Sequence, residues 1–135
     1  MIIDGNNLIL GRLASVAAKK ALLGDNIIIV NCDKVLVTGT KKNIVEIYKE
    51  KTDRGNPFKG PFFPKMPDRI VRRTIRSMLP YKKPRGREAY KRIMCYLGVP
   101  KKYEKENLET IKQASAQELK RYRYINLDKV KSHLK

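Results

Sequence analysis

Four arginines at helical spacing, set between two prolines, constrain this chain more than any other feature of its sequence. Proline is tolerated at the first position of a helix and stops one further along, so Pro67 and Pro80 predict a helix over residues 67–79. At about 100° per residue, one side of this helix carries the apolar and small residues Ile70, Val71, Thr74, Ile75, Met78 and Leu79. The opposite side carries Arg69, Arg72, Arg73 and Arg76.

This arginine face differs from an ordinary solvated helix face. Solvated faces usually mix charges, because like charges at i, i+4 repel one another, but no acidic residue lies among these arginines. Arginine also has the planar geometry that grips phosphate through two parallel hydrogen bonds. The spacing therefore predicts a binding surface for a polyanion.

The basic character continues beyond Pro80. Pro84 and Gly86 predict an irregular loop, followed by a short helical turn over residues 87–92. From Lys65 to Arg92 the chain holds eleven basic residues against two acidic ones, a surface suited to a sugar-phosphate backbone. Beyond the helix, the candidate RNA-binding residues are Lys82, Lys83, Arg85, Arg87 and Lys91. Tyr81 has two interpretations, either stacking on a base or packing on the loop itself.

The overall composition supports a nucleic-acid partner. The 135 residues have a formal net charge of +18, which is extreme for a protein without such a partner. A membrane-surface protein can be equally basic, but it would show one basic amphipathic helix with large apolar residues opposite. No segment approaches the ~20 apolar residues of a membrane span, and no secretory signal is evident, so we expect a cytoplasmic protein that does not contact membranes.

The sequence argues against an enzyme. Its one histidine, His133, lies at the C-terminal end, which leaves no histidine-based catalytic or metal site in the body of the chain. Cys32 and Cys95 are far apart in the sequence and form no CxxC pair, so two buried thiols are expected rather than a disulfide or a zinc site. We expect no cofactor, no metal and no small-molecule substrate.

The first hundred residues predict an α/β domain with a parallel sheet. Short β-branched runs predict strands near Ile2 and over residues 27–30, 35–38 and 93–96, and helical patterns cover 11–23 and 41–51. Residues 52–66 predict an ordered loop whose three phenylalanines, Phe58, Phe62 and Phe63, either cover the core or dock on a partner.

The chain changes character after Pro100. Residues 1–100 are predicted to form the α/β domain, and residues 101–135 a polar, partly separate C-terminal extension with one or two helices. Within it, Lys120, Arg121 and Arg123 alternate with Tyr122 and Tyr124. This run is a secondary candidate contact for RNA or for a neighbouring protein.

Several motifs, in order, resemble the large-subunit ribosomal protein thirteen family, in its archaeal and eukaryotic branch. They span residues 1–103, and the pairing of Met-Leu-Pro with Arg-Gly is the most specific of them. The matching segments are Gly11 to Ser15, Val30 to Lys34, Thr38-Gly39, Arg72 to Pro80, Arg85-Gly86 and Gly98 to Pro100.

The resemblance implies a three-layer α/β/α fold with a four-stranded, mainly parallel sheet. It also implies a structural protein of the large ribosomal subunit that binds large-subunit (23S-type) rRNA, contacts neighbouring ribosomal proteins and supports assembly by neutralising charge. Arg12, within the first motif, joins the candidate RNA-binding residues. An RNA-binding translational regulator outside the ribosome and a chromatin-type DNA binder remain alternatives.

Overall fold

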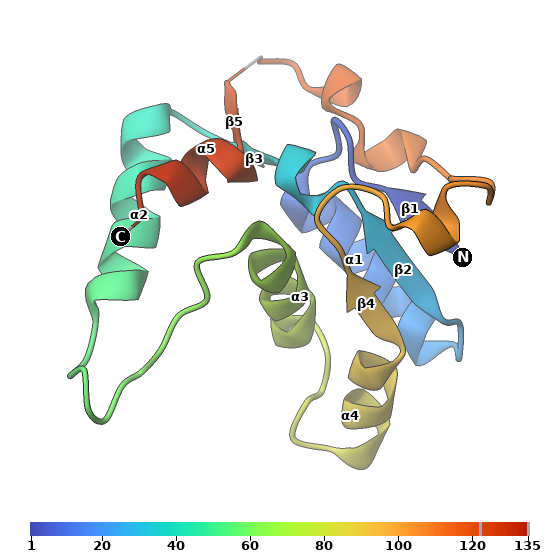
Figure 1. Cartoon of the computed structure of the whole chain (residues 1–135), viewed down its shortest axis with the longest axis horizontal. Coiled ribbons are helices and arrows are strands. Elements are labelled where there is room, and N and C mark those ends of the chain that lie inside the picture. The colour runs from blue at the N-terminus through green and yellow to red at the C-terminus, as the bar shows by residue number, and fades with distance from the viewer. Residues whose placement is uncertain (122, 135) are drawn as a thin grey trace.

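The protein has a mixed α/β fold built around a small parallel sheet (Figure 1). The computed structural model describes residues 1–121 and 123–134. The sheet has the order β1-β2-β4 and consists of β1 (Ile2–Asp4), β2 (Ile27–Val30) and β4 (Ile93–Cys95). Both pairings are parallel, with Ile28 of the central strand aligned to Ile2 on one side and Met94 on the other. The predicted parallel sheet is thus confirmed for three strands.

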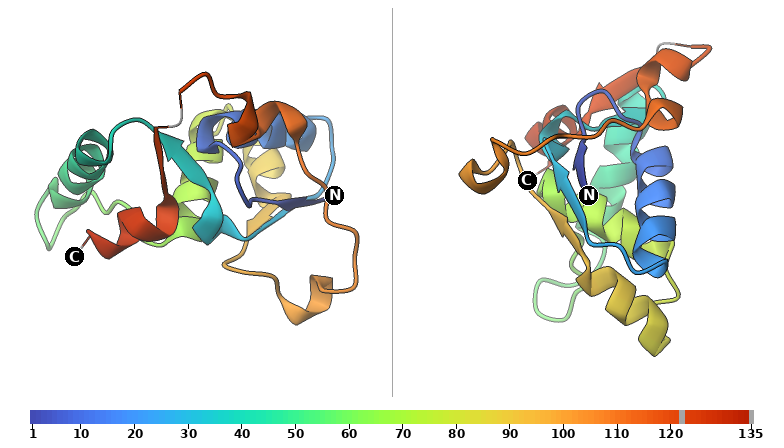
Figure 2. Two further views of the ribbon diagram at one scale, coloured as in Figure 1. Left: turned by 90° about the horizontal axis from the view of Figure 1, so that it is seen from above. Right: turned by 90° about the vertical axis from the view of Figure 1, so that its right-hand side faces the viewer.

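Three helices pack against one side of this sheet, as the right-hand view of Figure 2 shows for α1 and α3. They are α1 (Leu10–Leu22), α3 (Pro67–Ser77) and α4 (Pro84–Lys91). Helix α1 ends where predicted, because Gly24 adopts a φ of 104° that glycine alone reaches without strain. Helix α2 (Lys41–Asp53) lies apart from them, beside the C-terminal helix.

Side chains alternate between the two faces of the sheet. Ile3, Ile29 and Ile93 face the helices within the main core, whereas Ile2 and Val30 face the other way. That second face is covered by Tyr103 of the short 3-10 turn η2 (Lys101–Tyr103). The expected second helical layer is therefore wrong, since a turn covers only part of this face and Met94, aligned with Ile28 on it, is 41% exposed.

The predicted four-stranded sheet is also wrong. Strand β3 (Leu36–Thr38) does not join the parallel sheet but pairs antiparallel with β5 (Tyr124–Asn126). The sequence of residues 35–38 indicates a strand, but it does not indicate which other strand pairs with it, because the partner can lie far away in the chain. Here the partner comes from the last part of the chain.

The residues after Pro100 hold one α-helix among those described, α5 (Leu127–Ser132). The rest is β5 and the 3-10 turns η2, η3 (Lys112–Ala114) and η4 (Ala116–Glu118). Backbone hydrogen bonds tie this segment to β1 and to the start of α1: Asp4 N–H donates to Glu109 O (2.9 Å) and Ile9 N–H donates to Ala114 O (2.8 Å). Division of the chain near residue 100 stays a prediction.

Two of the family-like motifs meet at the end of β2. Asn31 adopts a left-handed φ of 55°, and its N–H donates to Gly98 O (2.9 Å). In return, Gly98 N–H donates to the Asp33 carboxylate (3.3 Å). The motif Val30 to Lys34 and the motif Gly98 to Pro100 are therefore joined by two hydrogen bonds, which stabilise the fold.

The two cysteines, distant in sequence, are neighbours in the fold. Both are free, Cys32 is buried and Cys95 is half-buried. A hydrogen bond with the Cys95 thiol, together with burial, raises the pKa of Cys32 far above its usual value. Cys32 therefore remains a neutral thiol, and it follows β2 in the 3-10 turn η1 (Cys32–Lys34) instead of lying in a strand.

Replacing Leu127 tests whether the C-terminal segment belongs to the core. Its side chain has no exposed surface, so Leu127→Ala should lower the free energy of unfolding by about 2–5 kcal/mol in urea denaturation. The matched control is Leu108→Ala, whose side chain is 38% exposed and which should cost far less. Equal, small effects of the two changes would mean that α5 is only loosely attached.

Candidate nucleic-acid interface

The predicted amphipathic helix is confirmed as α3, with Pro67 at its first turn. Ile70, Val71 and Ile75 are buried, and the helix packs on α1 and β4. It ends at Ser77, two residues earlier than predicted, and Leu79 then continues the buried side. The arginine side faces away from this core.

The four arginines do not play one role. Arg72 is half-buried, its Nε donates to Ile93 O (3.1 Å), and its guanidinium carbon lies 4.4 Å from the centre of the Tyr90 ring. A charged donor on a backbone carbonyl and a cation–π contact both stabilise this position. Arg72 therefore fastens α3 to β4 and is partly unavailable to a ligand.

Two of the other arginines, Arg69 and Arg73, are exposed and present their charge to the outside. Arg76 resembles Arg72 in part, because it is half-buried and its guanidinium carbon lies 4.2 Å from the centre of the Tyr81 ring. Between described residues, the one ion pair joins Arg54 and Glu50. No acidic side chain among residues 1–121 and 123–134 thus neutralises the arginine face, and an outside anion would relieve the repulsion between its members.

The loop predicted after Pro80, from Tyr81 to Arg87, is wrong in its second half, because α4 already begins at Pro84. Proline at this position opens the helix. Gly86 lies inside the helix, where glycine is required because a Cβ would overlap Pro80 O. The Met-Leu-Pro and Arg-Gly motifs thus touch through their backbones, and this contact fixes the basic turn between α3 and α4.

Hydrogen bonds from α4 also hold the turn in place. Arg87 Nη2 donates to Lys82 O (3.0 Å) and its Nε donates to Tyr81 O (3.2 Å). The Tyr81 ring meets Tyr90 edge-on, with ring centres 5.4 Å apart. Of the two interpretations of Tyr81, these contacts favour packing within the protein.

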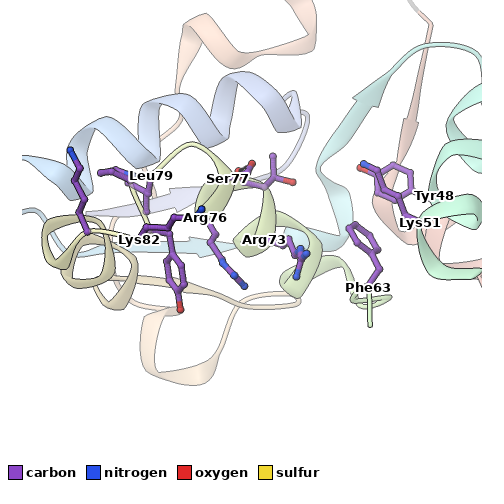
Figure 3. Close-up of a pocket in the computed structure, with 12 residues that line it drawn as sticks. Tyr48, Lys51, Phe63, Arg73, Arg76, Ser77, Leu79 and Lys82 are labelled. Carbon is purple, nitrogen blue, oxygen red and sulfur yellow. Dashed lines mark hydrogen bonds between the residues drawn. The ribbon is translucent and has the colours of Figure 1, made fainter. Parts of the chain in front are cut away.

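Two hollows flank Arg73 and Arg76. The larger, about 780 Å³, lies between α2, α3 and the turn after α3, and the smaller, about 600 Å³, lies on the loop before α3. Figure 3 shows Tyr48 and Lys51 of α2 on one side of the larger hollow, with Arg76, Leu79 and Lys82 on the other. Burial raises the pKa of Tyr48 and keeps its hydroxyl protonated.

The structure brings some predicted site residues together and separates others. Arg73 and Arg76 line both hollows, Lys82 and Lys83 line only the larger one, and Arg69 and Arg72 line only the smaller one. Arg85 and Lys91 are exposed on α4. Arg12 is exposed on α1, where Nη1 donates to Gln113 O (3.3 Å). Lys120, Arg121 and Arg123 are exposed, and Tyr122 lies outside the described residues.

Three residues of the site were not among the predicted RNA-binding residues. Lys51 and Tyr48 come from α2, whose inner and outer sides are weakly distinguished in sequence, and Phe63 comes from the loop. No periodic signal could have joined them to α3. In the described part of the chain, no cluster of three or more His, Cys, Asp or Glu could hold a metal, and no helix there is long and apolar enough to cross a membrane.

Comparison with known proteins gives a consistent picture. Residues 1–102 match the family model described as Ribosomal protein L13. Three relatives carry the description large ribosomal subunit protein uL13. That of Methanopyrus kandleri is 49% identical, covering 85% of this chain and 72% of its own length. That of Archaeoglobus fulgidus is 44% identical, and the match covers 98% of this chain and 86% of the relative. That of Methanocaldococcus jannaschii is 47% identical, and the match covers 98% of this chain and 96% of the relative.

The glycine contact between α3 and α4 yields a prediction with an unusual sign. On helix propensity alone, Gly86→Ala would stabilise the protein by about 0.5–1 kcal/mol. The clash with Pro80 should instead make it destabilising, by about 1–3 kcal/mol as for overpacking, measured by urea denaturation. The control is Gly11→Ala in α1, where a Cβ meets nothing within 4 Å and stability should hold or rise. A stabilised Gly86→Ala protein would contradict the described turn.

Proposed function

The chain belongs to the ribosomal protein L13 family, and from that premise we propose that it is a non-enzymatic structural protein of the large ribosomal subunit that binds large-subunit rRNA. The residues proposed to contact RNA are those of the α3 arginine face, the turn after it and α4. By neutralising phosphates at this surface, the protein would let RNA helices approach one another during assembly.

The observation that carries this proposal is the exposed, unneutralised charge on a rigid helix. Arg69 and Arg73 are exposed, Arg73 lines the same hollow as Lys82 and Lys83 of the turn, and no described acidic residue pairs with the two arginines. A-form RNA hides its base edges in a deep groove, so such side chains meet mainly phosphates and 2′-hydroxyls. The surface is thus suited to recognising the shape of folded RNA.

Neighbouring ribosomal proteins are the second class of partner that we propose. The loop before α3 divides its aromatic residues: Phe63 packs against the core, whereas Phe58 is 92% and Phe62 is 71% exposed. The exposed pair suits burial against another component of the subunit. Lys120, Arg121 and Arg123 remain a proposed secondary contact for RNA or protein.

The salt dependence of RNA binding tests the proposal. Arg69→Gln with Arg73→Gln removes two exposed charges and keeps helix propensity. Arg72 is left intact, because it holds the fold together. Each phosphate contact contributes about 0.7–0.9 to the slope of log K against log salt, so binding to an rRNA fragment should lose roughly 1.5 units of slope.

The matched control removes two charges elsewhere. Lys101→Gln with Lys105→Gln changes exposed residues at and just after η2, and it should leave the slope nearly unchanged. Duplex DNA as a competitor separates the chromatin-type alternative, because its grooves differ from those of A-form RNA. Equal slopes for the two double variants, or preference for DNA, would refute the proposed RNA surface.

A further inference from the structure

We infer that the larger hollow, between α2, α3 and the turn after α3, holds one unstacked nucleotide of the bound RNA, with its base against Phe63. This inference deepens the proposed function and rests on it. RNA recognition of this kind takes bases that are splayed out of a helix and stacks them on aromatic side chains. The hollow, at about 780 Å³, lies within the range of about 300–1,000 Å³ that is usual for ligand sites.

The aromatic wall comes from two segments that the fold brings together. Phe63 of the loop and Tyr48 of α2 have ring centres 6.1 Å apart and planes tilted by 58°. Tyr48 is buried, which leaves the half-buried Phe63 as the ring open to a ligand. Because Phe63 also packs on the main core, its ring is held in place before any ligand arrives.

Cations surround this wall. Lys51 Nζ lies 5.2 Å from the centre of the Tyr48 ring and 5.5 Å from that of Phe63, and the Arg73 guanidinium carbon lies 5.7 Å from Phe63. Arg76, Lys82 and Lys83 complete a lining that contains no acidic residue. A phosphate in the hollow would relieve the repulsion among these five charges, while a base would occupy the apolar wall.

Two hydroxyl groups add hydrogen-bond acceptors. Thr74 Oγ1 donates to Ile70 O (2.9 Å) and Ser77 Oγ donates to Thr74 O (2.7 Å). With their protons committed to the backbone, both oxygens can accept from a base amino group or a ribose 2′-hydroxyl. The cations can bind a phosphate, the ring can stack on a base, and the hydroxyl oxygens can accept from the base edge or the sugar. This combination suits a nucleotide better than an acidic peptide.

The experiment separates the base from the phosphates. Full-length protein is titrated with a short oligoadenylate and with an abasic RNA backbone of the same length and charge. Base stacking on an aromatic side chain is worth roughly a 5- to 150-fold change in affinity, so the oligoadenylate should bind tighter by a factor of that order. Phe63→Leu should abolish this preference, whereas Phe63→Tyr should keep it.

Phe58→Leu is the matched control, since Phe58 is an exposed aromatic residue of the same loop outside the hollow. It should leave the preference intact. Thermal unfolding of each variant shows whether it is folded. If Phe63→Leu is unfolded, the preference of the unchanged protein still tests the inference, because equal binding of the two oligonucleotides would contradict it.

Three outcomes would overturn the inference. They are equal binding of the two oligonucleotides by the unchanged protein, a preference that survives Phe63→Leu, or full displacement of oligoadenylate by an acidic peptide matched in charge. Salt-dependent binding of both oligonucleotides without preference would leave the proposed RNA surface standing. If neither oligonucleotide binds at low salt, the proposed function itself fails.

Discussion

The packing of one side of α3 against the core determines where this protein carries its charge. Ile70, Val71 and Ile75 are buried, and α3 contacts α1 and β4. Because the residues of a helix have fixed angular positions, burial of this side leaves the arginines on the other with no freedom to turn inward. The hydrogen bond from Arg72 to Ile93 O then fixes the helix along the strand.

In this arrangement, arginine side chains have two different roles. Arg72, Arg87 and Arg92 all donate to backbone carbonyls, Arg92 to Ala21 O at the end of α1 (3.0 Å). They stabilise the body of the protein, whereas exposed Arg69 and Arg73 add repulsion that the core must offset. In a protein of net charge +18, removing a basic residue can thus have opposite effects on folding at neighbouring positions.

The sequence predicts those parts of the fold that depend on local signals. The period of apolar residues and Pro67 locate α3, and Gly24 locates the end of α1. The partner of β3 was beyond reach, since it is β5, most of a chain length away. Pro84 and Gly86 suggested a loop, because sequence does not reveal that proline opens a helix there and that glycine admits the Pro80 backbone.

The candidate site was predictable to a similar degree. The arginine spacing identified the face, but not the separate role of Arg72, which depends on a carbonyl 21 residues away. The contact between Tyr48 and Phe63 could not be predicted, because these two residues meet only through tertiary packing. The proximity of the two free thiols, Cys32 and Cys95, could not be predicted for the same reason, since it follows from the register of β2 and β4.

Chemical modification of arginines, read residue by residue with mass spectrometry, tests the central claim most directly. Phenylglyoxal would be applied to the free protein and to the protein within large ribosomal subunits. We expect Arg69 and Arg73 to react readily in the free protein and to be protected in the subunit, while Arg72 reacts slowly in both. Equal reactivity of Arg69 and Arg73 in the two states would contradict the assignment of the arginine face to RNA.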